Sequence, residues 1–361
     1  MDEITTHRDT PTVLTEIPRY SAPPEPAPRA LEPPRIPPLN VALLLLTFLT
    51  TTTAGAYMNG EEVSLWHPIL AIVSLSSGLS FSIPLMIILF AHEMGHYLTS
   101  RYHSVDASLP YFIPAPPSLF IIGTFGAFIR MREPARTRRV MFDIGAAGPW
   151  AGVLLAIPAV IIGLYLSDVT PLDKSAGGLE LGNSILFLGL SHLVLGVDPS
   201  TVNVNLNPIA FAGWLGLFVT TLNLLPVGQL DGGHVVYALF PRRHRTISVL
   251  FVISCVLMVL VPLALGDSYW GGWLLWAVLS IALGLGHPST IDRDTPLNPR
   301  RAFAAWATVA LFIITFSPVP LSFVQPEAPP PQDQPSDHSQ EIIHHMPHYD
   351  DMLRQLGRAR I

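Results

Sequence analysis

Long apolar runs separated by short polar connections dominate the chain, and this pattern predicts membrane-spanning helices. A helix needs about 20 apolar residues to cross a bilayer. Two other apolar stretches, 66–75 and 184–197, are too short for separate spans, and we expect the second to be interfacial or re-entrant. The runs that approach the required length are 39–57, 78–97, 144–166, 208–225, 247–266, 269–285 and 302–321.

The two ends of the chain lack this pattern. Residues 1–38 contain ten prolines and little hydrophobic sequence, which predicts a disordered, Pro-rich cytoplasmic arm, and the composition of 325–361 predicts a disordered tail. No basic segment followed by an apolar one opens the chain, so we expect no cleaved signal peptide. The transmembrane domain is therefore predicted to occupy 39–324.

Composition supports a membrane protein over the two soluble domains that 361 residues would otherwise suggest. Half of the residues are apolar and 13% are charged, against about 25% in an ordinary soluble domain. A net charge of -6 without a basic block argues against nucleic acid as a partner. The single cysteine, Cys255, lies in an apolar run, so it excludes an intrachain disulfide and is expected to be buried.

The distribution of arginines predicts the orientation of the helices. If the seven runs alternate sides, the connections on the side of the N-terminus receive twelve arginines, and the opposite connections receive only Lys174. Basic residues favour the cytoplasmic side, so we expect a multi-pass protein of the cell (inner) membrane with a cytoplasmic N-terminus and an external C-terminus. The arginines are Arg101, Arg130, Arg132, Arg136, Arg138, Arg139, Arg242, Arg243, Arg245, Arg293, Arg300 and Arg301.

The sequence HEMGH at 92–96 lies at the end of the second apolar run. His92 and His96 are four residues apart, so on a helix they share one face and can hold one Zn²⁺. Glu93 is adjacent and can act as a general base on a water molecule at the metal. Ionisable groups inside a membrane helix are costly and indicate function, so we interpret these three residues as a candidate catalytic site.

A catalytic zinc normally has a third protein ligand, and the best candidate is in NLLPVGQLDGGH at 223–234. Pro226 and three glycines are expected to break the helix there and to leave irregular backbone, which is tolerated at membrane depth where it lines a cavity. Asp231 can then face the metal. The fourth apolar run ends on the same side as the second, so the two motifs should lie at similar depth; His234 is the rival ligand.

Other polar residues near the predicted spans have simpler interpretations. Asp143 in FDIGAAGPWAG is expected to cap the third helix, whose small residues would allow close approach of its neighbours. The remaining histidines of the apolar region are expected at solvent or interface positions rather than as ligands. These are His67, His103, His192, His244 and His287.

HEMGH on a membrane helix, AGPWAG after it and NLLPVGQLDGG about 130 residues later resemble the site-2 protease family of intramembrane zinc metalloproteases. The resemblance covers roughly 78–240. It implies one Zn²⁺ held by His92, His96 and Asp231, with Glu93 as the catalytic base. It also implies that Asn223, Pro226 and Gly232 shape the active site. The connection at 168–206 is too short for the PDZ domain of many relatives, so a compact form is expected.

The family also has an apolar hairpin that presents a strand edge to the substrate. SLFIIGTFGAFIRM at 118–131 occupies the corresponding position, with β-branched and aromatic residues and with Gly123 and Gly126 for a turn. Its GTFGAF segment resembles a compact branch that includes plastid members. The predicted fold is therefore an all-α polytopic membrane protein with about seven transmembrane helices and a short re-entrant β-hairpin.

The resemblance implies an intramembrane zinc metalloendopeptidase that hydrolyses peptide bonds within transmembrane segments of other membrane proteins. Its expected partners are a transmembrane substrate and the lipid bilayer, without nucleic acid. Two other functions stay open: a membrane metal transporter, and a catalytically silent scaffold that binds transmembrane partners. A transporter would not need Glu93 beside His92, and a scaffold would not need the complete catalytic set.

Overall fold

The computed structural model describes residues 36–61, 63, 68–172, 178–198, 201–287, 290–292 and 295–324. Almost all of the predicted arm 1–38 and the whole tail 325–361 lie outside these residues, as do His67 and Arg293. The described helices are α1 (Pro38–Met58), α2 (Pro68–Tyr102), α3 (Arg138–Tyr165), α4 (Ile185–Leu195), α5 (Pro208–Asn223), α6 (Asp231–Leu239), α7 (His244–Leu265), α8 (Gly272–Leu283) and α9 (Pro299–Thr315). The described strands are β1 (Tyr111–Pro114), β2 (Thr124–Phe128), β3 (Asp168–Pro171), β4 (Gly178–Leu181), β5 (Val202–Asn205) and β6 (Leu321–Val324).

Four helices are long and apolar enough to cross a membrane: α1, the part of α2 from Ile72 to Tyr102, α3 and α7. This is the pattern of a multi-pass membrane protein. Each of the seven apolar runs overlaps a helix, but α5, α8 and α9 have only 16, 12 and 17 residues. A straight helix of 12 residues rises about 18 Å, well short of a hydrocarbon core of about 30 Å. The count of seven spans is therefore not confirmed.

Helix α2 begins ten residues before the predicted span and includes most of the apolar stretch 66–75. The predicted span began at Gly78, after a segment that contains several serines. In the structure Ser76, Ser77 and Ser80 each donate a hydrogen bond to the carbonyl three residues earlier. Such back-bonding satisfies the hydroxyls within the helix itself, so the polar residues do not end it.

An antiparallel strand pair lies near the predicted hairpin, but it starts earlier than predicted, and its re-entrant character is not confirmed. β1 pairs antiparallel with β2, with Tyr111 opposite Phe128. Only the second half of 118–131 is a strand, because the amides of Leu119 and Phe120 bond the carbonyl of Pro116 and form a turn there. Gly123, at φ +78°, ends this turn, and a Cβ on it would lie 2.4 Å from the carbonyl oxygen of Thr50. Two further strand pairs, β3–β5 and β4–β6, correct the expectation of an all-α chain with one hairpin.

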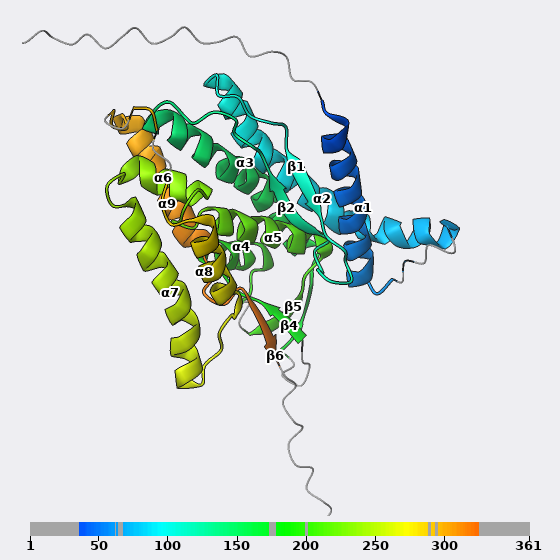
Figure 1. Ribbon diagram of the computed structural model, residues 1–361. Helices are drawn as coiled ribbons and strands as arrows, with labels where there is room; N and C mark the ends of the chain where they lie inside the picture. The colour runs from blue at the N-terminus through cyan, green and yellow to red at the C-terminus, as the bar shows by residue number, and fades with distance from the viewer. Residues whose placement is uncertain are drawn as a thin grey trace, which may run out of the picture.

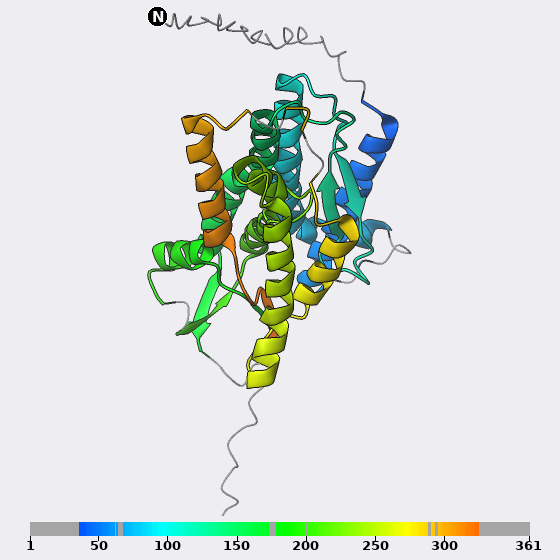
Figure 2. The ribbon, with the colours of Figure 1, turned by 60° about the vertical axis from the view of Figure 1, so that its left-hand side comes forward.

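Helix α3 is the centre of the fold and packs against α2, α5 and α6 (Figure 1). Its small residues allow close contact, as predicted: a Cβ on Gly95 of α2 would lie 2.6 Å from the carbonyl oxygen of Ala147. The hairpin packs beside α1, whereas the other strand pairs lie at the lower end of the molecule in both views (Figure 1, Figure 2). The consequence is a tight helical interior with the hairpin along one side.

Asp143 does not cap α3, contrary to the prediction. Thr137 is the N-cap, and its hydroxyl accepts from the amide of Val140 at 3.2 Å. Asp143 lies inside the helix and accepts hydrogen bonds from the Arg301 guanidinium at 2.7 to 3.1 Å, while its Oδ2 lies 2.9 Å from Nε2 of His103. It therefore links α3 to α9 and to the residue that follows α2. The burial of Cys255 is confirmed.

Candidate metal centre

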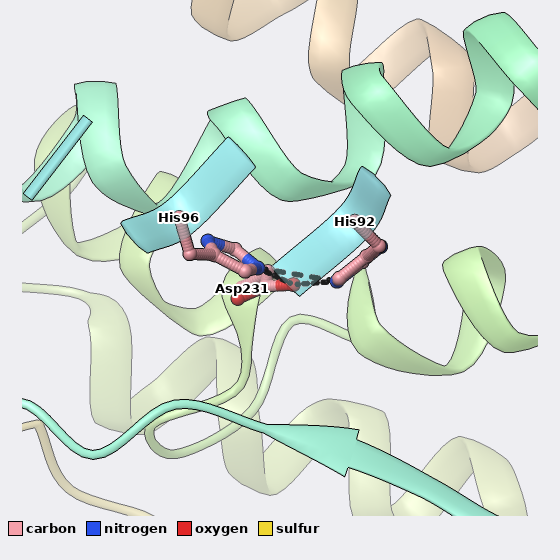
Figure 3. A group of neighbouring side chains, drawn as sticks. All are labelled: His92, His96 and Asp231. Carbon is pink, nitrogen blue, oxygen red and sulfur yellow. Dashed lines mark hydrogen bonds and ion pairs between the residues drawn. The ribbon is translucent and has the colours of Figure 1, made fainter. Parts of the chain in front are cut away.

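His92, His96 and Asp231 direct their ligand atoms toward one point (Figure 3). Oδ2 of Asp231 lies 3.2 Å from Nε2 of His92 and 3.2 Å from Nε2 of His96. The two Nε2 atoms are 3.1 Å apart. Both histidines are buried, and the Asp231 side chain is 15% exposed. Residues 135 positions apart in the chain therefore form one compact donor set.

The local fold explains how these side chains meet. His92 and His96 lie one turn apart on α2, so they share a face. Helix α5 ends at Asn223, and Asp231 begins α6 after a short irregular segment. Gly232 and Gly233 belong to α6 rather than to irregular backbone, which corrects the prediction. A Cβ at these two positions would lie 1.9 and 2.4 Å from carbonyl oxygens of the preceding segment, so both glycines allow α6 to start close to it.

Helix α3 packs against the imidazoles of His92 and His96 and fixes their positions. Nδ1 of His96 donates to the carbonyl oxygen of Ile144 at 2.7 Å, which leaves the lone pair of Nε2 directed at the centre. A Cβ on Gly148 would lie 2.1 Å from Nε2 of His96, and one on Gly152 would lie 3.2 Å from Nδ1 of His92. The glycines of AGPWAG are therefore the surface on which the histidine rings lie.

The donor set fits zinc. Two ligands bound tetrahedrally at about 2.0–2.1 Å from Zn²⁺ lie about 3.3 Å from each other, and the three donor atoms here are 3.1 to 3.2 Å apart. Two imidazole nitrogens and one carboxylate oxygen are a typical set for a catalytic zinc, which keeps its fourth position for a reactant. The geometry requires no other protein ligand.

A pocket of about 610 Å³ opens at this centre. Glu93 lines it beside the two histidines and is itself buried. Residues 127–134, the end of β2 and the segment after it, also line this pocket. Glu93, the donor set and the hairpin strand therefore share one space that can hold an extended peptide.

The other predicted residues lie at different distances from the centre. Asn223 lines the pocket, and its Nδ2 is 3.0 Å from Nε2 of His92. Pro226 lies in the segment between α5 and α6, where its carbonyl accepts from Ser248 at 3.3 Å, and it supports that segment without lining the pocket. Gly123 and Gly126 shape the hairpin and do not line the pocket.

His234 lines the pocket but is not part of the donor set. Its Nδ1 lies 2.7 Å from Nε2 of His287, which also lines the pocket. His287 was expected at a solvent or interface position, because nothing in its local sequence relates it to a residue 53 positions earlier. His244 is buried rather than at solvent or an interface, whereas the His192 side chain is 48% exposed.

The chain is similar to proteins named as probable zinc metalloproteases over the part that builds this centre. The sequence model of peptidase family M50 matches residues 80–265, which is more than half of the chain. "Probable zinc metalloprotease EGY1, chloroplastic" of Arabidopsis thaliana is 36% identical over 163 residues, which cover 43% of this chain and 28% of that protein. "Probable zinc metalloprotease EGY2, chloroplastic" of the same plant is 29% identical over 173 residues, 48% of this chain and 30% of that protein.

A relative from rice has a similar degree of identity to the chain. "Probable zinc metalloprotease EGY1, chloroplastic" of Oryza sativa subsp. japonica is 36% identical over 172 residues, which cover 46% of this chain and 29% of that protein. The matched part of the chain thus spans less than a third of the length of these relatives. No solved structure is significantly similar to the chain. The match over 80–265 includes both motifs of the metal centre and confirms the resemblance to site-2 proteases: the chain belongs to peptidase family M50.

Proposed function

We propose that this protein is an intramembrane zinc metalloendopeptidase that hydrolyses peptide bonds within transmembrane segments of membrane proteins. The observation that carries the proposal is the convergence of His92, His96 and Asp231 beside Glu93 in one pocket. Zn²⁺, one ion per chain, is the metal that fits this donor set. The names of the relatives as zinc metalloproteases give further support.

The hairpin supports a way to hold the substrate. A transmembrane helix hides its peptide bonds, so it must unwind before hydrolysis. β2 pairs with β1 along one edge and, among the described residues, with no strand along its other edge. The end of β2 lines the pocket that contains Glu93. Addition of the unwound segment to this free edge would supply main-chain hydrogen bonds and hold it extended.

The chemistry follows from the roles of the side chains. When bound, Zn²⁺ supplies Lewis-acid chemistry, since it makes water a stronger nucleophile at neutral pH and polarises the scissile carbonyl. Glu93 accepts the proton of the attacking water and returns it to the leaving nitrogen. His96 keeps its orientation because the Ile144 carbonyl holds its Nδ1. The Asn223 amide, next to His92, is suited to orient the substrate peptide.

Two alternatives are less well supported. A membrane metal transporter would be expected to have ligand groups along a path. Within the described part of the chain, one group of three His, Cys, Asp or Glu side chains is close enough to hold a metal. A silent scaffold would not require Glu93 beside the ligands, in the pocket that the hairpin lines.

The deciding experiment uses the full chain in proteoliposomes with a tethered single-pass reporter helix. We expect cleavage of the reporter, about one zinc per chain, loss of cleavage on chelation and its return with Zn²⁺. Zinc uptake into the vesicles without cleavage would indicate a transporter. Stable reporter binding without cleavage, at full zinc content, would indicate a scaffold.

We also propose that the N-terminus is cytoplasmic and the C-terminus external, with 1–38 and 325–361 flanking a membrane domain at 39–324 in the cell membrane. The starts of α1, α3 and α9 and the end of α2 lie at one end of the molecule, which supports a common arginine-rich face (Figure 1, Figure 2). Cysteines inserted in each tail of a Cys255→Ser form should be labelled from opposite sides. Labelling of both from one side would contradict the topology.

A further inference from the structure

A second histidine pair lies in the catalytic pocket and has no part in the chemistry described above. Nδ1 of His234 and Nε2 of His287 are 2.7 Å apart, a short hydrogen bond. The ring of Tyr237 stacks on that of His287, with centroids 4.2 Å apart and planes 12° from parallel. The His287 ring is therefore held in a fixed orientation, and its hydrogen bond fixes the orientation of His234.

This pair adjoins the metal centre. His234 is three residues after Asp231, so on α6 the two residues share a face. A Cβ on Gly145 would lie 2.7 Å from the Cβ of His234, while the carbonyl of the preceding residue of α3 binds His96. Neighbouring positions of α3 thus support a metal ligand and His234. Both imidazoles of the pair line the pocket that contains Glu93.

The hydrogen bond determines what His234 can offer. Two imidazole nitrogens can share a hydrogen bond only if one of them is an unprotonated acceptor, so the bond requires at least one neutral ring. Nδ1 of His234 is occupied by this bond, and its Nε2 has no hydrogen-bond partner among the described residues. If His287 donates, the proton of a neutral His234 is on Nε2, the ring atom that remains for a group in the pocket.

We propose that His234 is a second catalytic residue, whose Nε2–H donates a hydrogen bond to the oxygen of the scissile carbonyl, and that His287 positions it. The proposal rests on the protease activity proposed above. Attack of water on the peptide carbon moves negative charge to that oxygen, and a fixed donor in a buried pocket stabilises the charge more than the neutral carbonyl. Removal of one such donor typically lowers kcat by about 10²–10³.

The test compares variants of the full chain on the tethered reporter, with kcat, KM and zinc content measured on each sample. We expect His234→Leu to lower kcat by about 100-fold, with KM within about twofold and one zinc per chain. His234→Gln, which retains an N–H at similar reach, should recover part of that loss. His287→Leu should lower kcat by about tenfold, and adding it to His234→Leu should have no further effect.

The matched control is His192→Leu, because His192 is a half-exposed histidine on α4, outside the pocket, and its loss should not change kcat. Wild-type kcat in His234→Leu would overturn the proposal. So would equal losses in His234→Leu and His234→Gln, or loss of zinc, because these indicate a structural or ligand role. If the wild type itself fails to cleave the reporter, the protease function fails too; an active wild type with an unaffected His234→Leu contradicts this proposal alone.

Discussion

Two histidine pairs line one pocket, and they differ in the groups that complete them. His92 and His96 face a carboxylate oxygen of Asp231 at 3.2 Å, so three donor atoms point at one another. His234 and His287 bond each other, and a tyrosine ring covers the second. The first arrangement brings three acceptor atoms together, as a cation site requires, whereas the second shares one proton between its two rings.

The comparison shows that imidazoles alone do not define a metal site. Both pairs are in one pocket, and His92, His96 and His234 each lie against a glycine of α3. A carboxylate adds the negative charge that a divalent ion requires, and it sets the third direction of a tetrahedral site. The pair without a carboxylate is instead suited to hydrogen bonding.

The largest effect is expected from Glu93→Gln. Glutamine keeps the shape of glutamate but cannot accept a proton at neutral pH, so reporter cleavage should fall by about 10²–10⁴ or more. Zinc should stay near one per chain, because Glu93 is not in the donor set. Reporter cleavage and zinc are measured on the same sample. Near-normal activity would overturn the general-base role, and loss of both activity and zinc would indicate a structural one.

Asp231→Ala removes the feature that distinguishes the metal-binding pair. The two imidazoles remain, but the third ligand and its charge are lost. Loss of a residue that only orients a ligand lowers metal affinity by up to about 100-fold. Loss of a ligand itself should therefore lower zinc affinity by more than about 100-fold. Zinc retained after mild chelation is the measurement, with circular dichroism in detergent to show that the helices persist. Equal zinc in mutant and wild type would rule out Asp231 and favour His234 as the ligand.

Gly148→Ala tests the support from α3. The new Cβ would lie 2.1 Å from Nε2 of His96, so the ring must move away from its position opposite Asp231. Zinc affinity and reporter cleavage should each fall by about 10- to 100-fold, as for the loss of other groups that orient a ligand. Gly189→Ala on α4 is the matched control, because a Cβ there meets nothing within 4 Å. A similar loss in both variants would indicate a general effect of alanine.

Asp143→Asn should have the smallest effect, on stability alone. Asp143 accepts charge-assisted bonds from Arg301, but both side chains are partly exposed, at 18% and 31%, which limits their contribution. We expect the free energy of unfolding to fall by about 1 kcal/mol, with zinc content unchanged. Thermal unfolding in detergent measures this. Asp198→Asn, at a side chain that is 53% exposed, is the control and should not shift the midpoint.

The parts of the structure that local pattern controls could be predicted from the sequence. Apolar runs identified the helices because burial and main-chain hydrogen bonding act within each segment. HEMGH identified a two-histidine face because helical spacing is local. Asp231 could be assigned to the same site because the second and fourth apolar runs are predicted to end on the same side of the membrane. The lengths of the spans were less predictable, since serines such as Ser77 can bond back to their own helix.

Features that depend on distant partners were not predictable. β4 pairs with β6 over more than 130 residues, and neither strand has a turn signal that points to the other. The hairpin begins earlier than predicted because the residues assigned to its first strand form a turn after Pro116. Asp143 resembled a helix cap, but its partner Arg301 is 158 positions away. His287 belongs to the same class, because only the tertiary fold brings it to His234.

The hydrogen bond that holds His96 has an uneven sensitivity to substitution. Its acceptor is the carbonyl of Ile144, which every amino acid possesses, so exchange of the isoleucine for valine or leucine leaves the anchor in place. Gly148, which lies against the same imidazole, cannot be exchanged in this way, because the side chain of every larger residue would overlap the His96 ring. A saturation library across α3 should therefore return many aliphatic survivors at 144 and only the parental residue at 148. The main-chain hydrogen bond at 144 therefore tolerates substitution, whereas the contact between 148 and the imidazole does not.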